Sequence, residues 1–219
     1  MLALGTFPMG TTEFVVAGLL SEIASDLRVR VAQAGRSGRL WLALAACTTT
    51  TGGVLAMFSY VSPLLTDRAD LAASLLPLAL VGFGAGAFAG FLVGGRLGDV
   101  RPHTTTIAAP AATTVLLLAL CLLADLPAAA VALVALLGFF GLGANPVLIS
   151  LAVRYAGRAP TLGSALTVSA FNAGTAAGSW VAGRSLGSSL GATGPAVVGT
   201  VIAALTLIPV LLLAARRES

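Results

Sequence analysis

The stretch LAASLLPLALVGFGAGAFAGFLV, residues 71–93, decides the class of fold. Its 23 residues include no charged side chain. A run of about 20 apolar residues is the length that an α-helix needs to cross the hydrocarbon core of a bilayer. Its glycines fall at positions 82, 84, 86 and 90, and small residues let helix backbones approach closely in lipid. The stretch therefore predicts a membrane-spanning helix that packs tightly against a neighbour.

The composition of the whole chain agrees with this prediction. The 219 residues are 58% hydrophobic and only 9% charged, and the mean hydropathy is +1.01. Soluble domains carry about 25% charged residues. The formal net charge is +4, without a long basic patch, so a nucleic-acid-binding role is excluded. The lipid bilayer is the expected environment.

Six further runs resemble this stretch in length and apolar character. The seven predicted spans are Leu2–Leu20, Leu40–Leu65, Leu71–Val93, Thr104–Ala124, Ala128–Val153, Thr161–Gly183 and Thr193–Ala215. The first continues into an amphipathic segment, Ser21–Leu27, that is expected to leave the membrane, and Gly94–His103 is expected to be a polar turn. The predicted fold class is an all-α polytopic membrane protein with about seven transmembrane helices.

The arginines predict the orientation of these helices. Alternate loops place ten of the twelve basic residues on one side of the membrane and leave Arg68 and Arg184 on the other. Loops on the cytoplasmic side carry an excess of Arg and Lys. The C-terminus is therefore expected in the cytoplasm, and the N-terminus outside if all seven helices span. The ten are Arg28, Arg30, Arg36, Arg39, Arg96, Arg101, Arg154, Arg158, Arg216 and Arg217.

Glu13 is the sharpest candidate for a functional residue. It lies in the apolar run Leu2–Leu20, where a carboxylate costs about 2.5–3.5 kcal/mol on insertion scales. Such a group is usually kept because it faces protein or water and acts there. One interpretation is a protonatable group that couples proton movement to transport. The alternative is a buried acid that Thr11, Thr12 or a neighbouring helix satisfies.

Other polar and aromatic residues in the spans have both a functional and a structural interpretation. Phe58 and Tyr60 could line a pocket, or pack at the membrane boundary where Tyr often lies. Asn145 precedes Pro146, which breaks a helical hydrogen bond; the amide could face a cavity or join two helices. Cys47 and Cys121 lie inside apolar runs and are expected to be small core residues, not a disulfide or a metal pair. No P-loop is present, and no cofactor is expected.

Six stretches resemble the major facilitator superfamily, in the drug:proton antiporter branch that includes sugar-efflux and chloramphenicol-resistance permeases. GTTEFV at 10–15, with GLLSEIASDL at 18–27 and QAG at 33–35, resembles the first helix of that branch and the start of its second. FSYVSPLLT at 58–66 resembles its seventh helix, and AFNAG at 170–174 its eleventh. GGRLGD at 94–99 resembles the loop motif between helices eight and nine.

This resemblance implies proton-coupled efflux of a small molecule, a drug or a sugar, by alternating access in the bacterial cytoplasmic membrane. Protons and that small molecule are the expected partners, and the protein is not expected to be an enzyme. Glu13 matches the acid on the first helix of the branch and is assigned proton coupling. The residues assigned to substrate binding are Phe58, Tyr60, Asn145, Phe171 and Asn172. The loop motif, with Gly95, Arg96 and Asp99, is expected to act in conformational change.

The chain departs from the family pattern after Gly35. It passes directly into the segment that resembles helix seven, so about five helices are missing by comparison. The expected organisation is a first helix at 1–27, an arginine-rich junction at 28–39 and a six-helix half at 40–219. Removing five helices forces the first helix or the whole C-terminal half to invert, or the first helix not to span. The arginines favour keeping the C-terminal half in place, and Pro8, two threonines and Glu13 make the first helix the weaker segment. A transport-incompetent remnant is the alternative function, and a homodimer is a further option.

Overall fold

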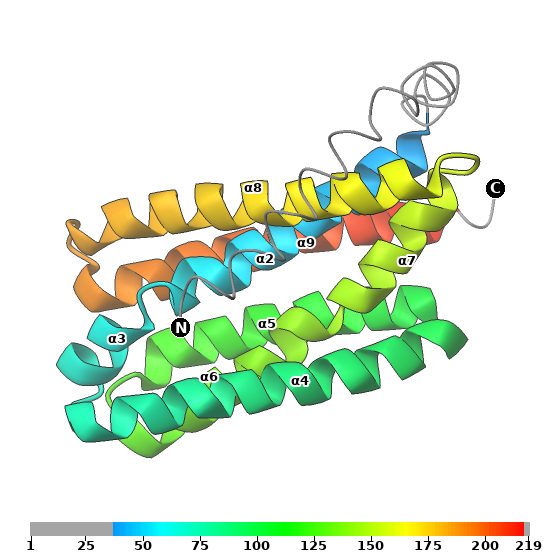
Figure 1. Ribbon diagram of the computed structural model, residues 1–219. Coiled ribbons are helices and arrows are strands. Elements are labelled where there is room, and N and C mark those ends of the chain that lie inside the picture. The colour runs from blue at the N-terminus through cyan, green and yellow to red at the C-terminus, as the bar shows by residue number, and fades with distance from the viewer. Residues whose placement is uncertain (1–36, 217–219) are drawn as a thin grey trace, which may run out of the picture.

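A computed structural model describes residues 37–216, in which all regular secondary structure is helical and no strand occurs. The long helices lie side by side as a bundle (Figure 1). Four shorter elements connect them: α3 (Val61–Pro63), the π-helical η1 (Leu64–Arg68), and the 3₁₀ turns η2 (Ala73–Leu75) and η3 (Gly191–Thr193). The long helices are α2 (Gly38–Phe58), α4 (Leu76–Val100), α5 (Pro102–Leu123), α6 (Pro127–Gly143), α7 (Asn145–Tyr155), α8 (Pro160–Leu186) and α9 (Gly194–Ala215).

Five segments of the described chain are long and apolar enough to cross a membrane. They are Gly38–Phe58, Ala73–Val100, Pro102–Leu123, Pro127–Tyr155 and Gly191–Ala215. The helix α8 is longer than most of them, but it is not among the five. The predicted span Leu2–Leu20 lies outside the described residues. The all-α polytopic membrane fold is confirmed, and α8 is the helix whose composition sets it apart.

Prolines and a serine start several of these helices. Pro102, Pro127 and Pro160 are the first residues of α5, α6 and α8. Proline suits this position, because its fixed φ matches the helix and its missing N–H would be unpaired there anyway. At the start of α2, the Ser37 side chain accepts a hydrogen bond from the backbone N–H of Leu40 at 3.3 Å. The local sequence therefore fixes where these helices begin.

Two predicted boundaries are wrong. The expected turn Gly94–His103 is helical as far as Val100, because Gly94 packs on Gly143 and Gly98 on Val147, which continues the contact of α4 with its neighbour. The predicted span Leu40–Leu65 ends earlier, at Phe58. Tyr60 has φ −123° and ψ 27°, which ends the helix before Val61 starts the next short one.

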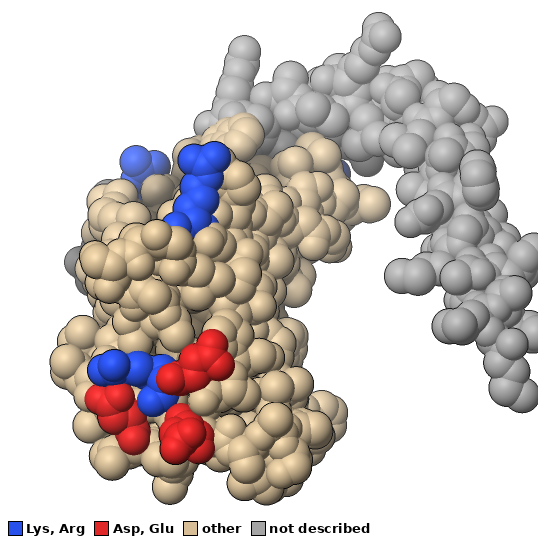
Figure 2. All heavy atoms as spheres, turned by 90° about the vertical axis from the view of Figure 1, so that its left-hand side faces the viewer, with Lys and Arg blue, Asp and Glu red and all other residues tan. Residues whose placement is uncertain are grey.

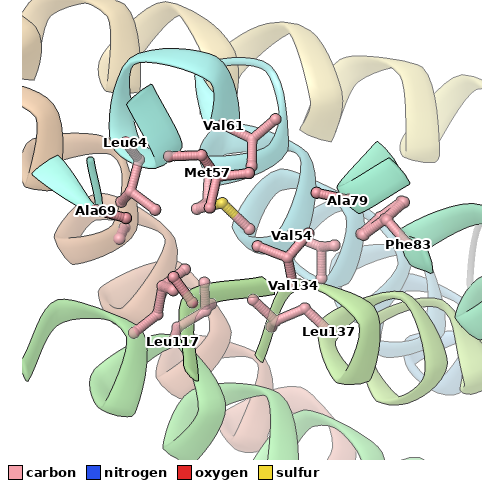
Figure 3. Packing of buried hydrophobic residues seen from close by; sticks show 14 of the residues in the cluster. Val54, Met57, Val61, Leu64, Ala69, Ala79, Phe83, Leu117, Val134 and Leu137 are labelled. Atoms are coloured by element: carbon pink, nitrogen blue, oxygen red, sulfur yellow. The ribbon is translucent and has the colours of Figure 1, made fainter. Parts of the chain in front are cut away.

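The main hydrophobic core lies where α2 ends, between α2, the short elements that follow it, and helices α4, α5 and α6. Val54 and Met57 of α2 point towards Leu117 of α5 and Val134 of α6, and all four are fully buried (Figure 3). Phe83 of α4 closes the cluster on one side. This core holds one end of the bundle together.

The tightest contact between two helices joins α4 and α6. Three glycines of α4 each lie against a backbone carbonyl of α6. A Cβ added at any of them would overlap that carbonyl. Gly86 faces Ala135, Gly90 faces Phe139, and Gly94 faces Gly143. We call this contact the α4–α6 seam. The tight packing predicted from the glycine pattern is confirmed.

The two ends of the bundle differ in charge. Among residues 37–216, one end holds Arg39, Arg96, Arg101, Arg154, Arg158 and Arg216 with a single acid, Asp99. The opposite end holds Arg68 and Arg184 with Asp67, Asp70 and Asp125. Figure 2 shows this second end, where acidic side chains surround an arginine. Arg68 and Asp125 form an exposed ion pair of 2.9 Å. We call the two the arginine end and the aspartate end.

Candidate functional site

Helices α2 and α8 run side by side in the same direction, and small residues bring them together (Figure 1). Gly174 lies against the carbonyl of Thr48, and Gly178 against that of Gly52. A side chain at either glycine would overlap these carbonyls. This contact, the α2–α8 seam, places one face of α8 on α2 and leaves the opposite face exposed.

Hydroxyl groups cross the α2–α8 seam at two levels. The Thr51 side chain donates a hydrogen bond to the backbone carbonyl of Phe171 at 3.0 Å. Nearer the aspartate end, the hydroxyls of Ser59 and Ser179 lie 2.9 Å apart and share a hydrogen bond. The Phe171 ring is half-buried and packs towards the inner cluster that contains Cys47 and Leu148. These contacts fix the rotation of α8 about its axis.

That rotation leaves Asn172 exposed at the middle of α8. No hydrogen bond to its amide is found within the described part of the chain. Apart from the apolar Val168, the exposed residues around it are small: Ser164, Ala165, Ser169, Ala173, Ala176 and Ala177. A side-chain amide needs several hydrogen-bond partners, and lipid tails supply none. This face is therefore suited to water or protein.

Phe58 and Tyr60 lie near each other in the sequence but contact different neighbours. The Phe58 ring stacks on Phe83 of α4, with 3.9 Å between ring centroids and 20° between planes. It therefore belongs to the main core. Tyr60 turns the other way, and its hydroxyl lies against Gly183 of α8. Of the two, Tyr60 is the one at the α2–α8 seam.

Asn145 lies inside the bundle, at the break between α6 and α7. Only 6% of its surface is exposed, and its Oδ1 is buried without a hydrogen-bond partner in the described structure. Ala144 ends α6 and Asn145 starts α7, with Pro146 next. The helix interruption expected from the Asn-Pro pair is confirmed. The amide is separate from the exposed face that carries Asn172.

The motif residues Gly95, Arg96 and Asp99 occupy the last turns of α4, at the arginine end. Gly95 and Asp99 line a pocket of about 220 Å³ between α4 and α7, which Ser150 and Arg154 line from the other side. Arg96 is exposed. The pocket thus places a carboxylate and a guanidinium on opposite helices without an ion pair between them among the described contacts.

The predicted site residues therefore fall into three groups. Tyr60 and Phe171 lie at the α2–α8 seam, and Asn172 lies on the exposed side of the same helix α8. Phe58, at the end of α2, and Asn145, at the start of α7, lie inside the bundle. The motif on α4 forms a separate site at the arginine end. Glu13 lies outside the described residues.

Sequence reasoning missed Thr51 and Arg154. Thr51 belongs to a run of four threonines at 48–51 inside an apolar helix, a signal that could have been used. Arg154 was counted only as a marker of orientation. Its place in the pocket depends on how α4 and α7 pack, which the sequence does not reveal.

Several curated proteins are similar to the chain over most of its length. A chloramphenicol resistance protein of Streptomyces lividans is 35% identical over 202 residues, which is 91% of this chain and 51% of that protein. The inner membrane transport protein YdhP of Escherichia coli is 28% identical over 92% of this chain and 50% of its own length. The uncharacterized MFS-type transporter YtbD of Bacillus subtilis is 27% identical over 80% and 46%.

No protein-family model and no solved structure matches the chain. The chain spans about half the length of the curated relatives that it matches. Those relatives are named as transporters or as a resistance protein, in agreement with the multi-pass helical fold. These findings show that the chain is similar to about half of a transporter of the major facilitator superfamily, as the resemblance of its motifs implies.

Proposed function

We propose that this chain takes part in proton-coupled efflux of a small molecule, a drug or a sugar, across the bacterial cytoplasmic membrane. The observation that carries the proposal is the exposed Asn172 at the centre of α8. A polar group at that depth is typical of a residue that lines a path for substrate or ions. The name of the Streptomyces relative makes chloramphenicol the first compound to test.

In this proposal, the exposed side of α8, opposite the α2–α8 seam, forms part of the wall of a central cavity. Asn172 binds polar groups of the substrate, and Tyr60 and Phe171 border the same seam. Phe58 and Asn145 are buried or stacked in the described state, so they reach the cavity only when α4 or α7 shifts relative to α2. The first group is therefore expected to respond most strongly to substitution.

Glu13 supplies the proton coupling in this proposal. A protonated carboxyl is neutral and a deprotonated one is charged, so protonation changes how well the group is tolerated in a cavity that closes to water. Substrate and proton bind in turn as the cavity opens to one side of the membrane and then to the other. The protonated carboxyl group of Glu13 releases its proton to the cytoplasm, and the resulting carboxylate takes up another proton from outside.

Gly95, Arg96 and Asp99 are proposed to act in the change of conformation. Asp99 and Arg154 face the same pocket from α4 and α7. Closure of the pocket would bring the two charges together, which stabilises one of two arrangements of these helices. Gly95 leaves space at the mouth of the pocket, and the exposed Arg96 meets solvent or lipid head groups.

Drug susceptibility and transport in membrane vesicles test the proposed efflux. The full chain is produced in a drug-sensitive bacterium, and energised efflux of labelled chloramphenicol is measured in inside-out vesicles. We expect uptake into the vesicles that collapses with the proton gradient. Glu13→Gln should abolish it and Asn172→Ala should reduce it several-fold, whereas Leu118→Ala, on the exposed side of α5, should leave it unchanged. Equal transport by the wild type and Glu13→Gln would show that Glu13 does not couple protons.

The second candidate function is that of a transport-incompetent remnant that only inserts into the membrane. The observation that favours it is the coverage of about half of each relative. A cavity between two halves needs groups from both sides, and the described residues supply one. This candidate predicts normal insertion of the chain with no gradient-dependent uptake of any compound of a broad drug and sugar panel.

The charge difference between the two ends supports an orientation with the arginine end in the cytoplasm. The described chain reaches Arg216 at that end, so the C-terminus is proposed to be cytoplasmic. A C-terminal green fluorescent protein should fluoresce, whereas a C-terminal alkaline phosphatase should stay inactive. The opposite pair of results would reverse the orientation.

A further inference from the structure

Four buried polar residues, each from a different helix, lie between the two apolar clusters inside the bundle. Along α2, for example, Thr50 follows Cys47 of the inner cluster and precedes Val54 of the main core. The helices α5, α6 with α7, and α9 repeat this order. The four residues are Thr50 of α2, Thr113 of α5, Asn145 of α7 and Thr206 of α9, and all are buried. We call them the polar layer.

A contact between α2 and α6 places Asn145 at the height of Thr50. Gly141 of α6 lies against Val54 of α2, and the two helices run in opposite directions. Asn145 lies four residues beyond Gly141 towards the arginine end, and Thr50 lies four residues from Val54 in the same direction. Equal steps along two helices give equal rises. The amide and the hydroxyl are therefore on one level of the bundle.

The other two threonines reach the same level. Gly53 of α2 lies against Ala203 of α9, and these helices also run in opposite directions. Thr50 and Thr206 each lie three residues from this contact, towards the arginine end. Thr113 lies one turn towards the arginine end from the part of α5 that belongs to the main core. The polar layer thus crosses the bundle between its two apolar clusters.

The three threonines use their hydroxyl hydrogens within their own helices. Each donates a hydrogen bond to the backbone carbonyl one turn earlier, at 2.7 Å for Thr50, 2.8 Å for Thr113 and 3.1 Å for Thr206. A hydroxyl has one hydrogen and two acceptor lone pairs. These oxygens can therefore only accept further hydrogen bonds.

The amide oxygen of Asn145 adds another acceptor to the layer. Oδ1 is buried and has no hydrogen-bond partner in the described part of the chain, and the residue is only 6% exposed. Buried polar atoms without a partner are costly, and the great majority in proteins bond to protein or to ordered water. The polar layer has more acceptors than donors, so it suits a ligand that brings hydrogens.

Water suits this site better than a cation does. The buried residues of the described chain include no acid, and a cation without a counter-charge is far costlier to bury than a neutral molecule. An internal water typically makes about three hydrogen bonds to buried polar groups. The side chains that border the layer include the small Cys47, Ala109 and Ala203. Water is the smallest neutral donor of two hydrogen bonds.

We propose that the polar layer binds one internal water molecule. The water donates one hydrogen bond to Asn145 Oδ1 and a second to a threonine hydroxyl oxygen of the layer. It thereby joins the break between α6 and α7 to a neighbouring helix across the bundle. Because the described bundle forms this site by itself, the site does not depend on whether the chain transports a substrate.

X-ray radiolysis footprinting tests for this water. Hydroxyl radicals formed from a bound water oxidise the side chains beside it, even where bulk solvent does not reach. The full chain in lipid nanodiscs is irradiated without a substrate, and its peptides are analysed by mass spectrometry. We expect oxidation of Cys47 and Leu148, which lie beside the layer and are fully buried. Met57, equally buried in the main core, is the internal control and should stay unmodified.

A pair of variants tests the part played by Asn145. Asn145→Leu removes the amide oxygen and should lower the oxidation of Cys47 and Leu148 several-fold. The matched control is Thr167→Val, which removes another fully buried hydroxyl that is bonded within its own helix. Thr167 belongs to α8 and lies outside the layer, so this variant should keep the oxidation of the wild type.

Three results would overturn the proposal. Unmodified Cys47 and Leu148 in the wild type would show that no water occupies the layer, and this result does not require any variant to fold. Oxidation of Met57 to the same extent would show that bulk solvent reaches the interior. Unchanged oxidation in Asn145→Leu would show that Asn145 does not hold the water. None of these results depends on efflux, so they are separate from the test of the proposed function.

Discussion

The two seams of the bundle use the same device to bring helices together but differ in what they present outward. Gly90 of α4 lies against the carbonyl of Phe139, as Gly174 of α8 lies against that of Thr48. The outward side of α4, however, is apolar, with Phe88 69% exposed. The outward side of α8 carries Asn172.

This difference separates two tasks that glycine-rich sequences perform. Close approach of the backbones requires only that one side of each helix lacks side chains. The side chains on the opposite side then indicate what surrounds the helix, because large apolar groups suit lipid and amides do not. The apolar outward side of α4 suits lipid tails. On the outward side of α8, Asn172 suits protein or water, although the exposed Val168 and Trp180 flank it along the helix. The apolar character of the two helices agrees with this difference. The segment that contains α4 is long and apolar enough to cross a membrane, whereas α8 is not among such segments of the described chain.

Placing a charge on the outward side of each helix should give the largest difference between α4 and α8. Phe88→Asp puts a carboxylate at the middle of α4 in contact with lipid, which costs about 2.5–3.5 kcal/mol. We expect a large drop in folded protein recovered from membranes. Asn172→Asp should have a much smaller effect on yield, because the outward side of α8 already carries a polar group at this position. Equal losses in the two variants would show that α8 also faces lipid.

A methyl group in the α4–α6 seam should have the next largest effect. Gly90→Ala forces a Cβ onto the carbonyl of Phe139, and backbone cannot move aside as a flexible side chain can. Overpacking of this kind costs about 1–3 kcal/mol. Thermal unfolding in detergent should show a lower midpoint. The matched control is Gly84→Ala in the same helix, one turn before Phe88. Its new Cβ meets no atom within 4 Å, so the unfolding midpoint should stay unchanged.

A hydroxyl deletion in the α2–α8 seam should have the smallest effect. Thr51→Val keeps the shape of the side chain but removes the hydrogen bond to the Phe171 carbonyl. Hydrogen bonds between transmembrane helices contribute about 0.6 kcal/mol on average. The unfolding midpoint should fall slightly. A fall as large as that of Gly90→Ala would mean that polar contacts, and not close approach, hold α8 in place.

Hydrophobic run length and the glycine pattern were sufficient to predict the helices and the tight packing of α4. They failed at boundaries where a tertiary contact decides. Gly94 and Gly98 suggest a turn by composition, but Gly94 meets the last residue of α6 and Gly98 meets Val147 of α7, so the helix continues. At Phe58 the opposite happens, since the apolar run continues while the helix stops. The length of an apolar run predicts neither the continuation of α4 nor the early end of α2.

The candidate site was predictable in its residue types more than in its geometry. Asn172 and Asn145 look alike in sequence, as amides within apolar runs, yet one is exposed and the other is 6% exposed. The rotation of each helix about its own axis decides between them. That rotation is set by the glycines and by Thr51, whose partner is 120 residues away.

The junction of the first and last described helices has a consequence for how this bundle can be reused. Arg39, at the start of α2, donates a hydrogen bond to the backbone carbonyl of Arg216, just after α9, so the first and last described helices have these termini side by side at the arginine end. Counting α6 with α7, the chain between them crosses the bundle six times, which is an even number. Such a unit can be duplicated in tandem through a short connecting loop, and the second copy keeps the orientation of the first. An odd unit would reverse at each repeat.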